Sequence, residues 1–212
     1  QSTPLFFQCS SVKTLSHVLY HARENNENLA VKIDAAGCID TEYGVRYFTP
    51  PESALELGEV SPEGLGRVVE EFTAGGSSNI LFIDMDCGID DRKLALMEGC
   101  DLILAMVTGD EVCRVKLKAM ARELQRLSQD RFPNLWDRVE VVVNRYDGQP
   151  GISRAIEEIA GKQVRAVLPE SLELKGYADI DRALDGGSSF GNAVEKLVNT
   201  FITHGEENTY ED

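Results

Sequence analysis

The first residues whose types and spacing could do chemistry are two aspartates at the end of an apolar run. Residues 79–84 are almost continuously apolar and close on Asp84, and Asp86 follows two positions later. Such a run is typical of a strand buried on both faces. An acid at its end can hold a magnesium-bound water beside the phosphates of a nucleotide. We expect Asp84 to be the metal ligand and Asp86 to share the field of the cation. An acid that only caps the next helix is the alternative.

A second candidate is the amide of Asn144, which follows the apolar run 138–143. An amide offers both a donor and an acceptor, so it can hydrogen-bond the edge of a base. Arg145 comes next and joins the candidate nucleotide-binding residues. Asp147 could read a guanine or simply form a turn with Gly148. A turn-capping asparagine is the competing interpretation for Asn144.

A third apolar run ends in Leu168 and Pro169. The proline ends a predicted strand and presents backbone groups near the expected position of Asn144. Ligands of parallel sheets sit at the carboxyl ends of the strands. We therefore expect Asp84, Asn144 and Pro169 to converge at one sheet edge as part of a nucleotide site.

A phosphate-binding loop is missing from this set. The pattern GxxxxGK[ST] does not occur in the sequence. Residues 75–78 precede a predicted strand and residues 185–189 follow none, so neither can cradle a phosphate between a strand and a helix. Phosphoryl transfer needs cations and backbone N–H groups around the β- and γ-phosphates. We predict no catalytic residue in this chain and no hydrolysis of ATP by it.

The elements that must position these residues alternate between strands and helices, which predicts an α/β fold. Its mostly parallel sheet would have helices on both faces, in three layers. The predicted strands are 44–49, 79–84, 101–107, 138–143 and 164–168. The predicted helices begin near residues 14, 61 and 110 or span 90–99, 152–160, 172–184 and 190–203. Residues 24–42 are expected to be loop-like with a short segment around Leu29–Ile33, and residues 52–60 are expected to be a connection. The helix that Asp110 opens is expected to bury Val112, Val115, Met120, Leu124 and Leu127.

Composition limits the partners. The 212 residues carry a net charge of −15, which repels polyanions and anionic lipid, so we expect no nucleic-acid partner. No run of 18 apolar residues occurs, so direct membrane insertion is not expected. Five cysteines without a CxxC pair favour reduced thiols in a cytoplasmic protein.

The order of these motifs resembles the MinD/ParA family of deviant-Walker ATPases, and within it the TadZ/CpaE branch of Tad (Flp) pilus assembly. The matching stretches include NILFIDMDCGID, CDLILAMVTGDE, VEVVVNRYDGQPGIS and IAGKQVRAVLPES. The resemblance covers roughly residues 5–203. It implies a P-loop NTPase fold in which Asp84 is the Walker B acid, Asn144 contacts adenine, and Leu168 and Pro169 form a wall of the base pocket.

The sequence also departs from the pattern of the family in two ways. The D-x-P-P-G pattern of the family becomes Asp-Met-Asp-Cys-Gly at residues 84–88, and the loss of both prolines calls the usual switch geometry into question. The loop and first two strands of the family would lie ahead of Gln1. Residues 1–203 are then a partial ATPase domain and 204–212 an acidic tail. We predict that the chain pairs with the missing segment, swaps a strand with another copy, or is an incomplete sequence.

The resemblance implies a homodimer that acts in the localisation or assembly of a Tad/Flp-type pilus or secretion machine through protein partners. ATP and Mg²⁺ would bind in the intact parent, and whether this chain binds them is left open. Partners could recruit it to the cell pole or the inner membrane face. Two alternatives stay open, an active MinD/ParA-type ATPase in the full-length parent and a nucleotide-free interaction module.

Overall fold

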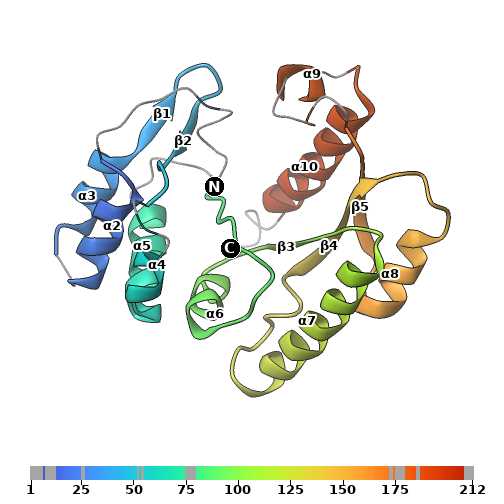
Figure 1. The fold of residues 1–212 in the computed structure, drawn as a ribbon, viewed down its shortest axis with the longest axis horizontal. Coiled ribbons are helices and arrows are strands. Elements are labelled where there is room, and N and C mark those ends of the chain that lie inside the picture. Colours follow the sequence, from blue (N-terminus) through green and yellow to red (C-terminus); the bar gives the residue numbers. More distant parts are fainter. Residues whose placement is uncertain are drawn as a thin grey trace. The chain divides into compact units, whose positions relative to one another are not determined.

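The structure is a computed structural model that describes residues 7, 13–24, 27–51, 53, 55–74, 80–171, 174, 180–184 and 187–207. The chain forms two compact units, Gln1–Cys100 and Asp101–Asp212. Figure 1 shows their helices and strands. Each unit is built around its own buried side chains and is described separately below.

The first unit is mainly helical. Its elements are α2 (Leu15–Arg23), α3 (Leu29–Ala36), β1 (Cys38–Asp40), β2 (Val45–Tyr47), α4 (Glu56–Glu59), α5 (Pro62–Ala74) and α6 (Asp91–Glu98). Apolar residues at helical spacing in α2, α3 and α5 form its core, including Val18, Leu29, Ile33 and Leu65. The side chain of Thr14 accepts a hydrogen bond from Ser16 N at 3.2 Å and so starts α2 where the sequence predicts.

Two loop predictions for this unit are wrong. Residues 24–42 were expected to be loop-like apart from a short segment around Leu29–Ile33, yet they contain α3 and β1. Residues 52–60 were expected to be a surface connection, yet they contain α4. The predicted strand at 44–49 is confirmed as β2, which pairs antiparallel with β1. Leu29 and Ile33 share one buried helix face, and the polar residues around them obscure this pattern in the sequence.

The predicted buried strand at 79–84 is also wrong. Residues 80–90 contain no strand, and Asn79 lies outside the described residues. Ile80 and Phe82 expose 61% and 83% of their surface. A strand exists only where another segment supplies hydrogen-bond partners, and no described strand pairs with this run. The apolar composition of this run is therefore not sufficient by itself to form a strand.

The second unit contains a parallel sheet. Its strands are β3 (Ile103–Val107), β4 (Val139–Tyr146) and β5 (Val164–Pro169), in the order β3-β4-β5. Its helices are α7 (Glu111–Asp130), α8 (Ile152–Ala160), α9 (Ile180–Leu184) and α10 (Ser189–Glu207). These strands confirm the three apolar runs predicted for this part of the chain. Of the predicted helix 172–184, residues 172, 173 and 175–179 lie outside the described residues.

Helices cover both faces of this sheet, as predicted. Val141 and Val143 of β4 pack with Leu117 of α7 and Ile156 of α8. Val142, between the two valines, packs with Leu197 of α10. Alternate residues of a strand point to opposite faces, so the run of valines is buried on both sides. The result is a three-layer α/β/α arrangement (Figure 1).

The buried face of α7 differs from the predicted one. Leu117, Ala121, Leu124 and Leu127 face the core. Val112 and Val115 are instead exposed. A period of 3.6 residues places these two valines on the side opposite Leu117, so the predicted stripe had the wrong phase in the first turns of the helix.

No helix in the described ranges combines the length and the apolar character needed to cross a bilayer.

Candidate functional site

The carboxyl ends of β4 and β5 lie side by side in the second unit. Tyr146 pairs with Pro169 in the strand register, and Glu170 N donates a hydrogen bond to Tyr146 O at 3.0 Å. Asn144 lies just before Tyr146, and Leu168 just before Pro169. The fold therefore brings these predicted site residues to the same edge of the sheet.

A β-bulge shapes this edge. Val143 pairs with Val167 and Tyr146 with Pro169, so β4 has one residue more than β5 between these pairs. Within the bulge, Arg145 has a left-handed backbone with φ of 55°. Bulges and left-handed non-glycine residues are concentrated at functional sites, where they redirect side chains. The predicted end of the strand at residue 143 is thus wrong, because β4 continues through the bulge to Tyr146.

Within the bulge, one hydrogen-bonding position of the Asn144 side-chain amide is already occupied. Arg145 N donates a hydrogen bond to Asn144 Oδ1 at 2.9 Å. This oxygen keeps a second lone pair, and the amide NH₂ donates to no other described side chain or backbone group. Asn144 can therefore still offer a donor and an acceptor, but its orientation is set by its own backbone.

The end of β3 carries a polar group at a position that was predicted only as a helix start. Thr108 Oγ1 donates a hydrogen bond to the Asp110 carboxylate, and Cys113 N donates to Asp110 Oδ1 at 2.9 Å. The hydrogen bond from Thr108 is the largest cause that lowers the pKa of Asp110, and the one from Cys113 N is the next. The Thr-Gly-Asp sequence directly after an apolar run was the signal that could have identified this group.

A turn glycine packs this strand end closely. A Cβ atom added at Gly109 would lie 2.9 Å from Cγ1 of Ile152 in α8. A side chain at this position therefore requires the Ile152 side chain to move. The glycine allows the turn after β3 to approach that helix.

Asp84 and Asp86 belong to the first unit and differ in their surroundings. Lys93 Nζ lies 2.6 Å from Asp86 Oδ1, and Gly88 N donates to the same oxygen at 2.7 Å. The hydrogen bond from Lys93, and then that from Gly88, lower the pKa of Asp86; Asp86 in turn raises the pKa of Lys93. Asp84 is exposed and has no ion pair with another described residue. It is the carboxylate of the two that a ligand can reach without breaking an ion pair.

The described residues do not form a complete metal site. They include no cluster of three or more His, Cys, Asp or Glu side chains that could hold an ion. Magnesium in nucleotide sites is commonly bound by one or two carboxylates together with phosphate oxygens and water. Asp84 fits the role of such a single carboxylate, and the remaining ligands would have to come from a nucleotide and water.

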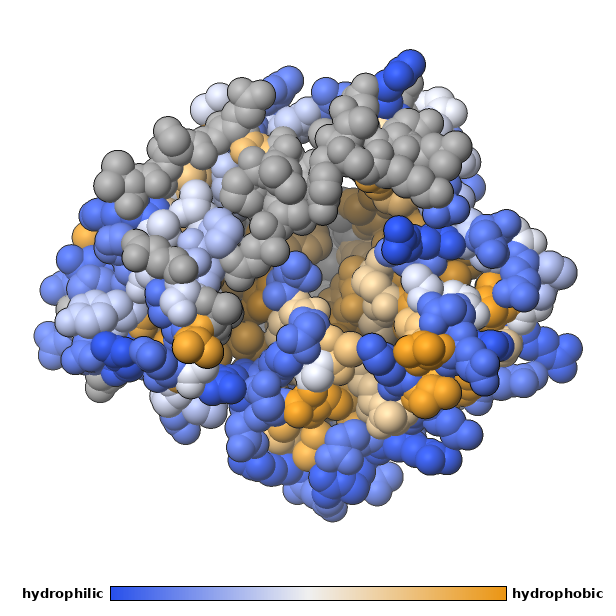
Figure 2. Space-filling view, in the orientation of Figure 1, coloured by the Kyte–Doolittle hydropathy of each residue, from blue (hydrophilic) through white to orange (hydrophobic). Residues whose placement is uncertain are grey.

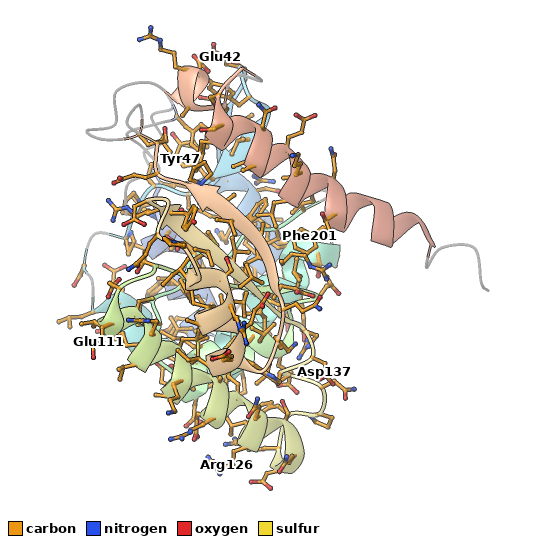
Figure 3. The ribbon with its side chains drawn as sticks, turned by 90° about the vertical axis from the view of Figure 1, so that its right-hand side faces the viewer. Glu42, Tyr47, Glu111, Arg126, Asp137 and Phe201 are labelled. Carbon is orange, nitrogen blue, oxygen red and sulfur yellow. The ribbon has the colours of Figure 1, made fainter. Side chains whose placement is uncertain are left out.

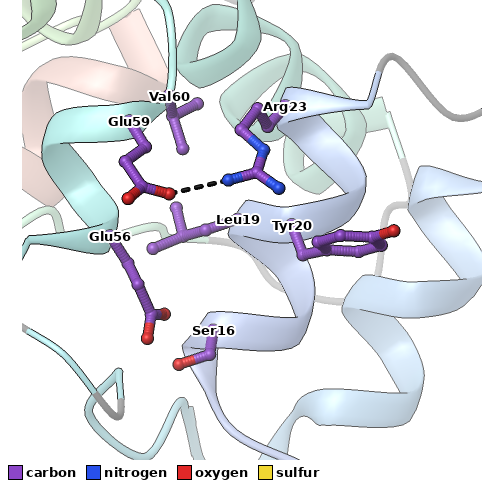
Figure 4. Close-up of a pocket in the computed structure, with 7 residues that line it drawn as sticks. All are labelled: Ser16, Leu19, Tyr20, Arg23, Glu56, Glu59 and Val60. Carbon is purple, nitrogen blue, oxygen red and sulfur yellow. Dashed lines mark hydrogen bonds and ion pairs between the residues drawn. The ribbon is translucent and has the colours of Figure 1, made fainter.

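A small cavity in the first unit lies away from these residues. It has a volume of about 210 Å³ and lies between α2 and the α4 region (Figure 4). Its lining is Ser16, Leu19, Tyr20, Arg23, Glu56, Glu59 and Val60. Arg23 Nη1 and Glu59 Oε2 form an ion pair across it at 2.7 Å. None of the predicted site residues lines this cavity.

Comparison with known proteins supports the fold. No protein-family model and no curated protein matches the sequence. A ParA-family ATPase from Chlorobium tepidum matches in structure with a TM-score of 0.68 and 14% identity, over 92% of this chain and 78% of that one. A chain of the MinC:MinD cell division protein complex of Aquifex aeolicus matches with a TM-score of 0.65 and 15% identity, over 95% of this chain and 87% of that one.

A third solved structure is MinD from Pyrococcus horikoshii complexed with Mg-ADP. It matches with a TM-score of 0.56 and 15% identity, over 88% of this chain and 77% of that one. At these identities the likeness concerns the fold alone. The chain has the α/β fold of the ParA and MinD ATPases.

Proposed function

We propose that this chain is the distal part of a TadZ/CpaE-like domain that helps to localise or assemble a Tad/Flp-type pilus or secretion machine. The observation that supports a nucleotide-linked role is the sheet edge where Asn144 lies beside Leu168 and Pro169. In a parallel sheet this edge is the usual ligand position. The likeness to a MinD complexed with Mg-ADP adds support from the fold.

In this proposal the chain supplies one part of a nucleotide site. Asn144 contacts the base, Leu168 and Pro169 form a wall of its pocket, and Arg145 lies beside it. Asp84 is the Mg²⁺ ligand, and the charge of Asp86 contributes to the electrostatic field at the ion. The phosphate-binding loop is placed on a segment of the parent protein, because GxxxxGK[ST] does not occur in these residues.

The free edge of the sheet is compatible with such a segment. Among the described strands, β3 pairs with β4 alone. Its sequence ILAMV has no charge or proline, the usual devices that block pairing at an edge. A further strand of the parent can be accommodated there. The domain proposed for residues 1–203 would be completed in this way, and residues 204–212 would follow it as an acidic tail.

We further propose that the intact protein is a cytoplasmic homodimer whose assembly depends on ATP and Mg²⁺. Its partners are proteins of the pilus or secretion apparatus, which recruit it to the cell pole or the inner membrane face. The MinC:MinD complex is a fold relative in which a partner protein is bound. This chain alone is expected not to hydrolyse ATP.

Two observations favour a second candidate function, an interaction module without nucleotide. Asp86 is already paired with Lys93, and Asn144 Oδ1 already accepts a hydrogen bond from its own chain. An active ATPase in the parent is the other alternative, and it requires a lysine-bearing loop upstream.

Calorimetric titration of the full-length parent with Mg-ATP tests the proposal. We expect saturable binding, and Asn144→Ala should weaken it about tenfold through loss of hydrogen bonds to the base. Asn192→Ala, an exposed asparagine on α10, is the matched control and should bind as the wild type does. An absence of heat up to millimolar Mg-ATP would favour the interaction module. Phosphate release by the parent would identify an active ATPase.

The cellular role needs a separate test. Deletion of the gene should abolish pilus assembly, and a fluorescent fusion should collect where the pilus machine assembles. Normal pili in the deletion strain would refute the proposed role without affecting the nucleotide result.

A further inference from the structure

The cavity between α2 and α4 in the first unit carries an excess of negative charge. Its lining includes one guanidinium, that of Arg23, and two carboxylates, those of Glu56 and Glu59. Glu24 adds a third carboxylate close to the same guanidinium, because its Oε1 lies 3.2 Å from Arg23 Nε. A single cation of the protein therefore faces three acids.

The guanidinium of Arg23 is already held by groups of the protein. Its Nη1 donates to Glu59 Oε2 at 2.7 Å and its Nε donates to Glu24 Oε1 at 3.2 Å. Its Cζ also lies 5.4 Å from the ring centroid of Tyr20, a favourable position for a cation. An anionic ligand would have to displace a carboxylate from Arg23, so the cavity favours a cationic one.

Each of the two carboxylates in the lining keeps one oxygen for a ligand. Glu56 Oε1 accepts a hydrogen bond from Ser53 N at 3.0 Å, and Glu59 Oε2 accepts the one from Arg23. Within the described part of the chain, the other oxygen of each carboxylate accepts no hydrogen bond. Residues three apart on a helix lie on one face, so the two carboxylates belong to the same wall of the cavity.

An apolar floor separates these two oxygens. Leu19 and Val60 line the cavity and expose only 3% and 2% of their surface. Figure 4 shows Leu19 between Glu59, at the end of the cavity near Arg23, and Glu56. The volume of about 210 Å³ is sufficient for a ligand of about six to ten non-hydrogen atoms. The cavity thus has an apolar middle with a carboxylate toward either end.

We propose that this cavity binds a short aliphatic diamine, a four-carbon chain with an ammonium group at each end. One ammonium donates to Glu59 Oε1 and the other to Glu56 Oε2, while the methylene groups contact Leu19 and Val60. Hydrogen bonds between an ammonium and a carboxylate are stronger than those between neutral groups. Burial of the methylene groups adds a hydrophobic contribution. The inference does not depend on nucleotide binding.

The charge of the whole chain also favours a cationic ligand. Its 36 acidic residues outnumber 21 lysines and arginines, and hydrophilic residues cover much of the face shown in Figure 2. Such a field raises the local concentration of cations. Other acids, such as Glu42, Glu111 and Asp137 in Figure 3, are exposed and do not line the cavity. They attract a diamine only through the general field, which salt screens.

A lysine side chain of a partner protein has the same ammonium chemistry but fits less well. It brings one positive charge to a wall with two carboxylates, so one of them stays without a cation of the ligand. A free diamine neutralises both Glu56 and Glu59.

NMR chemical-shift titration of the backbone amides of the full 212-residue chain tests the proposal. The probes are diaminobutane, aminobutane and butanediol, which share a four-carbon chain and carry two, one and no ammonium groups. We expect diaminobutane to bind about tenfold more tightly than aminobutane at low salt, and butanediol not to bind. The shifts should be concentrated in residues 16–23 and 56–60, and about 1 M salt should weaken the binding.

One pair of variants separates the cavity from the general field. Glu56→Gln keeps the oxygen that accepts from Ser53 N but removes the charge, and it should weaken diaminobutane binding about tenfold. Glu70→Gln changes the net charge by the same amount at an exposed position of α5 in the same unit. It should bind diaminobutane as the wild type does. Circular dichroism melts confirm that each variant folds.

A second pair tests the role of the guanidinium. Arg23→Gln removes the cation that competes for Glu59, so it should tighten diaminobutane binding about threefold or more. Lys32→Gln removes one positive charge from α3 in the same unit and should leave the affinity unchanged.

Four results would overturn the proposal. The first is an absence of saturable shifts up to millimolar diaminobutane, and the second is an equal affinity for diaminobutane and aminobutane. The third is the same affinity in Glu56→Gln and Glu70→Gln, which would show that only the general field attracts the ligand. The fourth is tighter binding of a short lysine-containing peptide than of diaminobutane, which would identify the lysine of a partner protein as the occupant.

Discussion

Lys93 Nζ lies 2.6 Å from Asp86 Oδ1, so the two aspartates that end the apolar run have different electrostatic roles. Asp86 is held in an ion pair with a lysine in the first turn of α6, while Asp84 is exposed and has no ion pair with another described residue. The two aspartates lie only two positions apart, yet they differ in charge environment because Asp86 is paired with a lysine seven residues further along the chain.

Lys93→Met should raise the pKa of Asp86 toward the ordinary range. Lys93 is the largest cause that lowers the pKa of Asp86, and the hydrogen bond from Gly88 N would remain. The change is measured by NMR titration of the Asp86 side-chain carboxyl. Lys116→Met removes an exposed lysine of α7 and should leave that titration unchanged. An identical Asp86 titration in wild type and Lys93→Met would contradict the ion pair.

The same pair predicts how stability depends on pH. The folded pKa of Asp86 is below its unfolded value, so its stabilisation is complete above the unfolded pKa and is lost as pH falls through the folded one. The folded pKa of Lys93 is raised, so its stabilisation is present below the unfolded lysine pKa and is lost as pH rises through the folded one. Urea midpoints of Lys93→Met should therefore differ from wild type at neutral pH and converge with it in acid.

Arg145→Gly should stabilise the protein by about 1 kcal/mol, because a left-handed backbone is strained for residues other than glycine. Arg154→Gly lies in the helix α8, where glycine is unfavourable, and should destabilise by about 1 kcal/mol. Urea unfolding measures both. Equal destabilisation by the two substitutions would show that the bulge at Asn144 and Arg145 is not formed.

Ile156→Ala should destabilise the protein by about 2–5 kcal/mol, and Ile156→Val by about 0.5–1.5 kcal/mol. Ile156 is fully buried between α8 and the sheet, so each lost methyl group leaves a cavity. Val198→Ala, at a partly exposed valine of α10, should cost less than about 0.5 kcal/mol. Chemical denaturation of the three variants gives the free energies, and a mild effect of Ile156→Ala would contradict the packing of α8 on β4.

Arg165→Lys should destabilise the protein by about 1 kcal/mol although the charge is kept. The guanidinium donates two hydrogen bonds to Glu140, at 2.7 and 3.2 Å, and lies 5.9 Å from the ring centroid of Phe201. A lysine cannot form this fork. Arg154→Lys changes a single exposed contact with Glu158 and should have no measurable effect in the same urea experiment. An equal response of both sites would refute the bidentate pair.

The sequence was sufficient for features that depend on near neighbours. The caps at Thr14, Asp90 and Asp110 form hydrogen bonds within three residues, so local chemistry predicts them. The valines of β4 are apolar on both faces, and that pattern alone predicts a buried parallel strand. The meeting of Asn144 with Leu168 and Pro169 follows from the same rule about strand ends.

The predictions that are wrong concern features that depend on groups distant in the sequence. The run that ends at Asp84 has the composition of a strand, but a strand needs hydrogen bonds from another segment, and none of the described strands supplies them. The phase of α7 was mistaken because Val112, Val115 and Leu117 are all apolar, and only packing against β4 and α8 selects the leucine.

The amino-acid sequence by itself therefore determined the helix starts, the buried strands of the second unit and the lack of a phosphate-binding loop within these residues. Only the tertiary structure decided the bulge at Asn144, the pairing of Asp86 with Lys93 and the exposure of Val112 and Val115 on α7. The physical reason is the distance along the sequence between the residues that decide each feature. Caps and apolar periods are settled by residues a few positions apart, whereas strand register, ion pairs and burial depend on segments that meet only when the chain has folded.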